Sequence, residues 1–289
     1  MTTWFVTGAS SGFGQAFATY ALSRGYNVVA TARDPSKITV RDPDRVLAVA
    51  LNVDSPGDAQ RAIDAAVTRF GGIDVVINNA GYGIVGAVEE TPESELRALM
   101  ETNFFGAVAV TRAALPVLRS QGRGAIVNIS SIGGQLSFAG FGAYSAAKFA
   151  IEGMSEALAQ EVAPFGIKVL IVEPGNFRTN LLGSGTRHMP MIDAYRATVG
   201  GTREFVSSMH GTQAGDPAKA AEAIDTALRA ERTPLRLQLG EDAVAAIRQH
   251  AQTLLADLEA WQSVGAATKF EGDDAGSLRL PEPAGQRGT

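Results

Sequence analysis

Segments typical of buried strands alternate with segments typical of helices along this 289-residue chain. The strand candidates are apolar along most of their length: Trp4–Val6, Asn27–Thr31, Val46–Leu51, Val75–Asn78, Ala125–Ile129, Lys168–Val172 and Leu235–Leu239. Helix candidates lie between them: Gly14–Ser23, Asp58–Phe70, Glu93–Leu118 (interrupted at Gly106), Ala143–Val162 and Pro217–Arg229. Apolar strands joined through helices form parallel sheets that are covered on both faces. The sequence therefore predicts one doubly wound α/β domain.

Composition and charge exclude several classes of protein. Apolar residues make up 45% of the chain and charged residues 19%, which is typical of a soluble globular protein. The net charge of −5 argues against nucleic acid or an anionic membrane as a partner. The chain has no cysteine, which suits a cytoplasmic location, and its three histidines are scattered, so we expect no metal site. We also expect neither a signal segment nor a membrane span, because no apolar run reaches ~18 residues.

A phenol, an ammonium group and a hydroxyl are the strongest chemical candidates. Tyr144 and Lys148 lie four residues apart in one helix candidate, so their side chains share a face. A phenol has a pKa near ~10, which a nearby ammonium group lowers by stabilising the phenolate. Ser131 follows a strand candidate, and its hydroxyl can hold a carbonyl or alcohol oxygen. The trio suits proton transfer to oxygen during hydride transfer at carbon, although a Tyr–Lys pair at this spacing is also common at surfaces.

Three glycines, Gly8, Gly12 and Gly14, lie in the turn between the first strand and helix candidates. Glycine lets a backbone approach a pyrophosphate closely, and N–H groups at a helix start favour the anion. The spacing is Gly-x-x-x-Gly-x-Gly, which differs from the common Gly-x-Gly-x-x-Gly fingerprint. We predict a dinucleotide at this turn; the alternative is a tight turn without a ligand.

Later strand ends carry polar or small residues on the side of the sheet where ligands bind. Arg33 follows the second strand candidate, where its planar fork suits the 2′-phosphate of NADP; alternatively it pairs with Asp34 or Asp42. Asn52 follows the third and can bind an adenine amino group or form a turn. Asn78–Gly81 ends the fourth, where small residues let a cofactor pass and Asn78 can brace neighbouring strand ends, or where the chain simply turns.

Asn103 lies inside a helix candidate, where an amide is unfavourable unless its side chain forms specific contacts. We predict that it perturbs the helix and positions a water, or that its role is purely structural.

The chain beyond the sixth strand candidate is less regular. The glycine-rich stretch of roughly Asn180–Gly215 is typical of a lid or binding loop. Its apolar residues can line a pocket for a largely apolar substrate or pack on the domain: Leu181, Leu182, Met189, Met191, Ile192 and Tyr195. Asp242–Trp261 reads as an amphipathic helix for core or subunit packing, and we expect Glu271–Thr289 to be poorly ordered. The predicted catalytic domain spans 1–265, with a substrate loop at about 176–215, a C-terminal helix at about 242–262 and a flexible tail over 266–289.

These motifs together resemble the classical short-chain dehydrogenase/reductase family across about residues 3–240. The matches run in order along the chain: Thr-Gly-x-x-x-Gly-x-Gly at Thr7–Gly14, Asn78-Asn79-Ala80-Gly81, Asn103, Ser130-Ser131, Tyr144-x-x-x-Lys148 and Pro174-Gly175. The resemblance implies a Rossmann-type parallel sheet of seven strands in the order 3-2-1-4-5-6-7, with helices on both faces.

The resemblance also implies a role for each matched residue. Tyr144 would be the catalytic acid/base, and Lys148 would bind the nicotinamide ribose and lower the pKa of Tyr144. Ser131, thirteen residues before the tyrosine, would orient the substrate oxygen, and Asn103 would hold the water of a proton relay. The implied cofactor contacts are Gly8, Ser10, Ser11, Gly12, Phe13, Gly14, Arg33, Asn52, Val53, Asn79, Ala80, Gly81, Tyr144, Lys148, Pro174, Gly175 and Thr179. Two residues depart from the family pattern: Asn52 stands where Asp is frequent, and Phe13 where Ile is commoner.

The implied activity is NADP(H)-dependent interconversion of a ketone or aldehyde and an alcohol, with NAD(H) also possible. The long loop and the C-terminal segment resemble the branch with 17β-hydroxysteroid-type dehydrogenases, which suggests an apolar small-molecule substrate. A redox-sensing protein that binds NADP(H) without turnover is the alternative, although such relatives usually lose the Tyr or the Lys. The glycine spacing disfavours an epimerase or dehydratase of the extended branch. The resemblance further implies a homodimer or homotetramer through Glu93–Leu118 and Ala143–Val162, with neither nucleic acid nor membrane as a partner.

Overall fold

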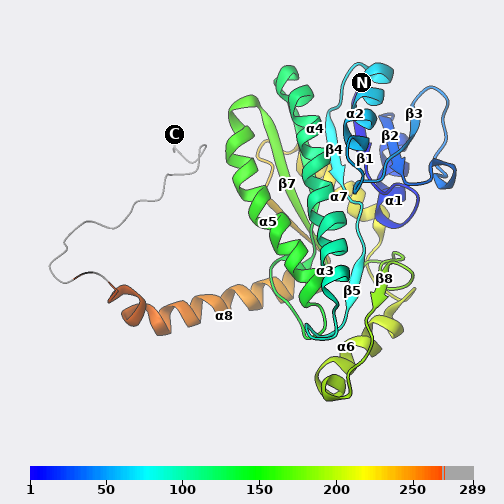
Figure 1. Ribbon diagram of the computed structural model, residues 1–289. Helices are drawn as coiled ribbons and strands as arrows, with labels where there is room; N and C mark the ends of the chain where they lie inside the picture. Colours follow the sequence, from blue (N-terminus) through cyan, green and yellow to red (C-terminus); the bar gives the residue numbers. More distant parts are fainter. Residues whose placement is uncertain (269, 271–289) are drawn as a thin grey trace.

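Seven parallel strands form one sheet in the order β3-β2-β1-β4-β6-β7-β9 (Figure 1). The structure, a computed structural model, describes residues 1–268 and 270. The strands are β1 (Thr3–Val6), β2 (Asn27–Ala32), β3 (Val46–Ala50), β4 (Val75–Asn78), β6 (Gly124–Ile129), β7 (Ile167–Pro174) and β9 (Arg236–Leu239). Counted along the chain within this sheet, the order is 3-2-1-4-5-6-7. The predicted fold and its strand order are therefore confirmed.

Helices cover both faces of the sheet (Figure 1). Helices α1 (Gly12–Ser23) and α7 (Pro217–Arg229) pack on one face; α2 (Asp58–Phe70), α4 (Gly106–Gln121) and α5 (Gly142–Val162) pack on the other. Neighbouring residues of one strand face opposite layers, so that Val6 packs toward α1 while Phe5 packs toward α2 and α4. Because the strands are covered on both sides, they can be apolar along most of their length.

The third helix candidate is divided by a π-helical turn. Helix α3 (Glu93–Met100) is followed by η2 (Glu101–Phe105) and then by α4. The side chain of Asn103 forms two hydrogen bonds outside the helix. Its Oδ1 accepts from the backbone N–H of Tyr82 (3.0 Å), and its Nδ2 donates to the Tyr82 carbonyl (2.8 Å). The predicted perturbation of the helix at Asn103 is confirmed, since π-turns form where the regular ladder is interrupted.

The prediction that residues 180–215 are irregular is wrong for two parts of this stretch. Strand β8 (Thr186–His188) pairs in parallel with β5 (Gly83–Val85), and α6 (Arg196–Met209) is a regular helix. Helix α6 contains Gly200 and Gly201, and each glycine costs about 1 kcal/mol relative to alanine in a helix interior. Burial of Val199 and Val206 against the domain offsets this cost, and neither contact is evident from local sequence. Short 3₁₀ turns occupy Pro35–Lys37, Ile132–Gly134, Ala163–Phe165 and Asp193–Tyr195.

A buried carboxylate fastens this segment to the domain. Glu90 accepts hydrogen bonds from the backbone N–H groups of Ile192 and Ala87 (2.7 Å each). It also forms an ion pair with Arg203 of α6 at 2.7 Å, where the carboxylate side chain is fully buried. The two N–H groups and the guanidinium hold the pKa of Glu90 below its usual range. One anion thus orders a segment that the sequence suggested was a free loop.

The C-terminal helix α8 (Glu241–Ala266) confirms the predicted amphipathic helix, but not the predicted packing in the core. Only Ala243 of this helix is buried, and α8 projects away from the body of the molecule (Figure 1). None of the described helices combines the length and apolar character that crossing a bilayer requires. The expectation for residues 271–289 falls outside the described residues.

Replacing Glu90 with Ala is expected to loosen the segment of residues 189–209. Loss of the carboxylate leaves Arg203 and two buried N–H groups without their acceptor, a local cost of about 2 kcal/mol. Hydrogen–deuterium exchange in this segment should accelerate by about 30-fold. The control is Glu89→Ala, which removes the neighbouring exposed carboxylate that accepts from Tyr195. Equal exchange rates in the two variants would show that Glu90 is not the anchor.

Candidate active site

The predicted site residues follow the carboxyl ends of four adjacent strands. Gly8 follows β1, Asn79 follows β4, Ser131 follows β6 and Gly175 follows β7. Strand ends at one edge of a parallel sheet lie close together and form the usual ligand crevice of open α/β folds. Arg33 and the Asn52–Val53 pair follow β2 and β3, on the outer side of β1.

Hydrogen bonds fix the glycine turn to the end of β4. The Thr7 hydroxyl accepts from the backbone N–H groups of Asn79 (2.8 Å) and Ala80 (2.9 Å), and Asn79 Nδ2 donates to the Thr7 carbonyl (2.8 Å). A Cβ atom added to Gly14 would lie 2.2 Å from the Gly8 carbonyl oxygen, so glycine is required for this close approach. Thr7 is part of the glycine motif, but no role was predicted for it. Its position directly before Gly8 was the signal that could have indicated one.

The start of α1 offers backbone N–H groups to an anion. Ser11 stands at the N-cap with an extended backbone and makes no side-chain capping bond. The N–H groups of the first turn therefore face the crevice without a side-chain acceptor, which suits a pyrophosphate. The Phe13 ring instead packs inward on Phe17 (5.4 Å between centroids) and Phe177 (5.1 Å), so any contact of Phe13 with a ligand falls to its backbone.

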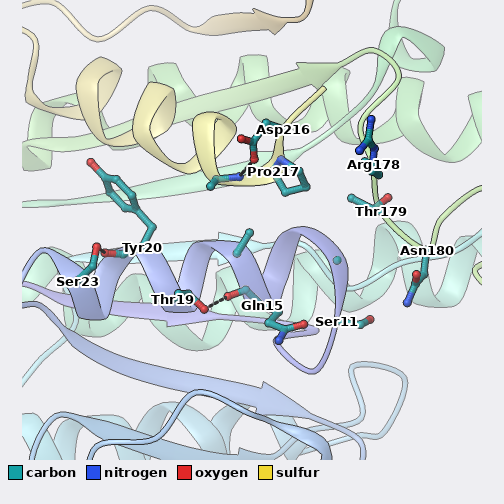
Figure 2. A pocket seen from close by; sticks show the side chains of 13 residues that line it. Ser11, Gln15, Thr19, Tyr20, Ser23, Arg178, Thr179, Asn180, Asp216 and Pro217 are labelled. Atoms are coloured by element: carbon teal, nitrogen blue, oxygen red, sulfur yellow. Dashed lines mark hydrogen bonds between the residues drawn. The ribbon is translucent and has the colours of Figure 1, made fainter. Parts of the chain in front are cut away.

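An open pocket of about 580 Å³ borders this turn between α1 and the start of α7. Figure 2 shows Ser11, Thr179 and Asn180 near one end of it, and Tyr20 and Ser23 near the other. Two predicted cofactor residues on different loops, Ser11 and Thr179, thus line one hollow.

Three of the four predicted catalytic side chains come together beside the end of β6, whereas the fourth, Asn103, bonds to the backbone of Tyr82. Tyr144 and Lys148 are both buried on α5. Lys148 Nζ donates to the carbonyl of Ile129, the last residue of β6 (2.8 Å), and lies 5.6 Å from the centre of the Tyr144 ring. Ser131 caps the short turn that follows β6, where its hydroxyl accepts from the Gly133 N–H (3.1 Å). The same hydroxyl acts to lower the pKa of the Tyr144 phenol.

The net pKa shift of Tyr144 is upward, opposite to the lowering that was expected from Lys148. Burial raises the pKa of Tyr144 above its ordinary value of 10.0, and hydrogen bonding with Ser131 offsets this only in part. Burial also lowers the pKa of Lys148 to about 8, against the opposing effect of Glu152. Desolvation dominates because both groups lie inside the domain. At pH 7 the phenol is therefore protonated and the amine is mainly charged, which are the states needed to donate a proton to oxygen.

Glu152 extends this row of side chains and was missed by the sequence analysis. It lies four residues after Lys148 on the same buried face of α5. Burial and the neighbouring Glu173 raise the pKa of Glu152 to about 7, while Ser130 and Arg236 act in the opposite direction. The repeated spacing of four residues, from Tyr144 to Lys148 to Glu152, was the signal available in the sequence.

One arginine holds the two buried carboxylates together. Arg236 Nε of β9 lies 2.9 Å from Glu152 and 3.4 Å from Glu173, and its Nη2 pairs with Glu156 at the surface. Gln135 donates to both Glu152 (3.2 Å) and Glu173 (2.7 Å). Because two carboxylates compete for one half-buried guanidinium, Glu152 retains a proton near neutral pH.

Side-chain contacts decide between the alternatives at the other strand ends. Asn78 Nδ2 donates to Asn128 (2.8 Å) and Thr111 (3.0 Å), so the predicted bracing between strand ends is confirmed. Asn52 Nδ2 donates to the Ser55 hydroxyl (2.9 Å), which matches the turn-forming alternative.

Neither surface ion pair considered for Arg33 forms in the described part of the chain. Asp34 accepts from Ser36 and pairs with Lys37, and Asp42 pairs with Arg45. The exposed Arg33 guanidinium is thus available to a ligand at the end of β2.

Apolar side chains surround the phenol. Ile84, Leu99 and Met189 form a buried cluster with Tyr144. Of the apolar residues predicted to line a substrate pocket, Met189 alone belongs to this cluster, while Met191 and Ile192 are exposed.

The remaining predicted cofactor residues lie at the same edge of the sheet as the glycine turn: Ser10, Gly12, Val53, Gly81 and Pro174.

A parallel sheet with a glycine turn after its first strand, and a half-buried hydroxyl beside a buried phenol and ammonium group after its fifth, define an oxidoreductase domain of the NAD(P)-binding Rossmann class. The family model for short chain dehydrogenases matches residues 2–190. The chain belongs to this short-chain dehydrogenase/reductase family.

Relatives named as an oxidoreductase and as a reductase match this chain over different lengths. Oxidoreductase BOA17 from Botryotinia fuckeliana is 40% identical over 269 residues, which cover 92% of this chain and 98% of that protein. A 3-ketodihydrosphingosine reductase from Bacteroides thetaiotaomicron is 46% identical over 174 residues, which cover 60% of this chain and 63% of that one.

Solved structures show the same fold. A short-chain dehydrogenase from Streptomyces avermitilis superposes with a TM-score of 0.87 at 49% identity, covering 93% of this chain and 100% of that chain. A short chain dehydrogenase from Burkholderia cenocepacia in complex with NADP gives 0.68 at 28% identity, covering 91% and 96%. A 3-ketoacyl-(acyl-carrier-protein) reductase from Brucella melitensis complexed with NADH gives 0.69 at 26%, covering 82% and 96%.

Glu152 is expected to make stability fall as the pH rises. Its folded-state pKa of about 7 exceeds the ordinary 4.5, so the folded protein binds a proton that the unfolded chain releases between these values. Replacing it with Gln should remove about 1–2 kcal/mol of the stability loss between pH 5 and pH 8. Urea unfolding at several pH values measures this slope. The control is Glu156→Gln, which removes the exposed partner of the same arginine; identical slopes in the two variants would refute the assignment.

Proposed function

We propose that this protein is an NADP(H)-dependent oxidoreductase that interconverts a ketone or aldehyde and a secondary alcohol, with Tyr144 as acid and base. The observation that carries the proposal is that Ser131 and the buried Tyr144 and Lys148 come together at the end of β6, on the same edge of the sheet as the glycine turn. Family membership supports the reaction class, because the relatives named above are oxidoreductases and reductases.

The residues at the glycine turn fit a dinucleotide. The turn leaves no space for a Cβ at Gly14, and the first-turn N–H groups of α1 lack a side-chain acceptor from Ser11. Gly8, Ser11, Gly12 and the backbone of Phe13 would hold the pyrophosphate. The exposed Arg33 would bind the 2′-phosphate, which supports NADP(H) over NAD(H). The bound nicotinamide supplies the hydride.

The protein's own groups handle the proton and the oxygen. In the direction of reduction, the Ser131 hydroxyl holds the substrate oxygen and the Tyr144 hydroxyl donates its proton to that oxygen. The resulting phenolate is stabilised by the ammonium of Lys148, whose nitrogen lies 5.6 Å from the ring centre. In oxidation the same phenolate takes the proton back. A positioned acid of this kind contributes about 10²–10⁴-fold in rate.

We further propose a largely apolar carbonyl substrate, as in the branch with steroid-type dehydrogenases. The buried Ile84, Leu99 and Met189 beside Tyr144 support this, because apolar walls bind apolar ligands. The Bacteroides relative, named a 3-ketodihydrosphingosine reductase, supports a ketone on an aliphatic chain.

A homo-oligomer through α3, α4 and α5 is also proposed. Phe105 in the turn η2 between α3 and α4, and Phe149 on α5, are 50% and 47% exposed, which suits a contact with another subunit.

Replacing Tyr144 with Phe is expected to lower kcat by about 10²–10⁴-fold, because the proton donor is lost while the ring remains. NADPH binding should stay within about threefold of the wild type. The assay follows nicotinamide absorbance with a panel of ketones and aldehydes, and Tyr26→Phe is the control because Tyr26 bonds to the distant Asp225. Near-normal turnover by Tyr144→Phe would reject the role of the phenol. A wild type that binds NADPH but reduces no carbonyl would favour a redox sensor.

Replacing Arg33 with Ala is expected to weaken NADPH binding by about 10–100-fold, the value of one or two charge-assisted hydrogen bonds. NADH binding should change by less than about threefold, since NADH has no 2′-phosphate. Fluorescence titration with both cofactors measures the two affinities. Arg45→Ala removes a basic residue already paired with Asp42 and should leave both unchanged. Equal losses for NADPH and NADH would remove the NADP assignment.

A further inference from the structure

Most of helix α8 has no packing partner in the described part of the chain. The 26-residue helix makes its main contacts with the body at its start, near β9 and the turn Ile132–Gly134, and then extends outward (Figure 1). Its second half carries five large apolar side chains that are 56–68% exposed: Leu254, Leu255, Leu258, Trp261 and Val264. Such a row is unusual on a surface unless another surface covers it.

The apolar residues of α8 follow the period of a coiled coil. Positions three and four residues apart alternate along the whole helix: Val244, Ile247, Ala251, Leu254, Leu258, Trp261 and Gly265. A spacing of three and four residues gives a narrow seam that faces one other helix. A helix that packed on the domain would show a broader apolar face. The pattern therefore indicates a helical partner.

We propose that α8 pairs in antiparallel orientation with α8 of a second copy of this chain. In this pairing Leu254 packs against the partner's Leu258 around a two-fold axis. Trp261 then faces the partner's Ala251, and Ile247 faces the partner's Gly265. Each large side chain meets a small one on either side of the central leucines, which is how helix seams fill space without overlap. A parallel pair would instead place tryptophan on tryptophan and glycine on glycine.

The area available is sufficient for such an interface. Leu254, Leu258 and Trp261 lie in the seam, and Leu255 and Val264 flank it; at roughly 100 Å² of exposed surface each, these five side chains offer about 500 Å² per copy. Two copies would bury about 1,000 Å², the lower limit for a specific interface. The pairing therefore forms an interface of moderate area, in which the second copy covers the seam without a further partner.

Charge favours a protein partner over a lipid surface. The polar positions of α8 include four acidic residues, Glu241, Asp242, Asp257 and Glu259, against Arg248 as the permanent cation. A helix bound to an anionic membrane is instead rich in Lys and Arg. The pairing brings Asp257 near the partner's Asp257 on the exposed rim, where salt screens like charges and the cost is small.

Sedimentation velocity of the full chain tests the pairing. In the variant Leu254→Glu/Leu258→Glu, carboxylates would be buried at the centre of the seam, so the assembly mass should halve and association should weaken by about 100-fold or more. The control Gln252→Glu/Ala256→Glu adds two charges at the same spacing on the outer face, and its mass should equal that of the wild type. Equal masses for the wild type and the seam variant would overturn the proposal and leave the chain's own C-terminal residues or a lipid surface to cover the seam.

Cysteine pairing tests the orientation, because the natural chain has no cysteine. Under oxidation the variant Leu254→Cys/Leu258→Cys should form covalent dimers on a non-reducing gel, since each sulfur faces the other position of the partner helix. The single variant Leu254→Cys should remain uncrosslinked in antiparallel pairs. Efficient crosslinking of the single variant would overturn the antiparallel arrangement. Activity and circular dichroism of each variant should match the wild type, because these side chains lie outside the folded body.

Discussion

The hydrogen bond from the buried ammonium of Lys148 to the carbonyl of Ile129 is the contact on which the proposed site depends. It joins α5 to the end of β6, and thereby places the phenol of Tyr144 beside Ser131, which follows the same strand. A buried charge is costly unless it is paired or hydrogen-bonded. Here the carbonyl and the negative field of Glu152 stabilise it, and burial still lowers the pKa of the amine to about 8. The geometry of the reaction centre is thus set by how one cation is accommodated.

The remaining features bring a ligand to that point. The Thr7 hydroxyl and the Asn79 side chain fasten the glycine turn to the end of β4, so that the start of α1 lies in register with the strand ends. The Glu90–Arg203 ion pair holds the segment that carries Met189 over the other side of the phenol. A polar cradle and an apolar wall therefore flank the proposed proton donor, which is the arrangement that the proposed reduction of an apolar carbonyl compound requires.

Sequence reasoning was most successful where local pattern and tertiary environment agree. The five inner strands of the sheet could be predicted because two-sided burial makes each of them apolar along most of its length; the edge strands β3 and β9 are less buried. Helix α6 could not, since Gly200 and Gly201 disfavour a helix locally and only the buried Val199 and Val206 reveal its packing. The residues Ser131, Tyr144 and Lys148 were identified from their spacing in the sequence. The upward shift of the Tyr144 pKa was not predicted, because desolvation depends on burial, which spacing does not report. Glu152 was missed because its partner Arg236 lies 84 residues away in sequence.

The central claim is that the buried ammonium supports proton donation by the phenol. Single-turnover reduction of a carbonyl substrate by protein pre-mixed with NADPH, comparing wild type with Lys148→Met, tests it most directly. The methionine keeps the length of the side chain and removes its charge. We predict that the chemical step slows by at least about 100-fold, in the range for loss of acid–base assistance. A rate within about threefold of the wild type would contradict the account, because the phenol would then act without its cation.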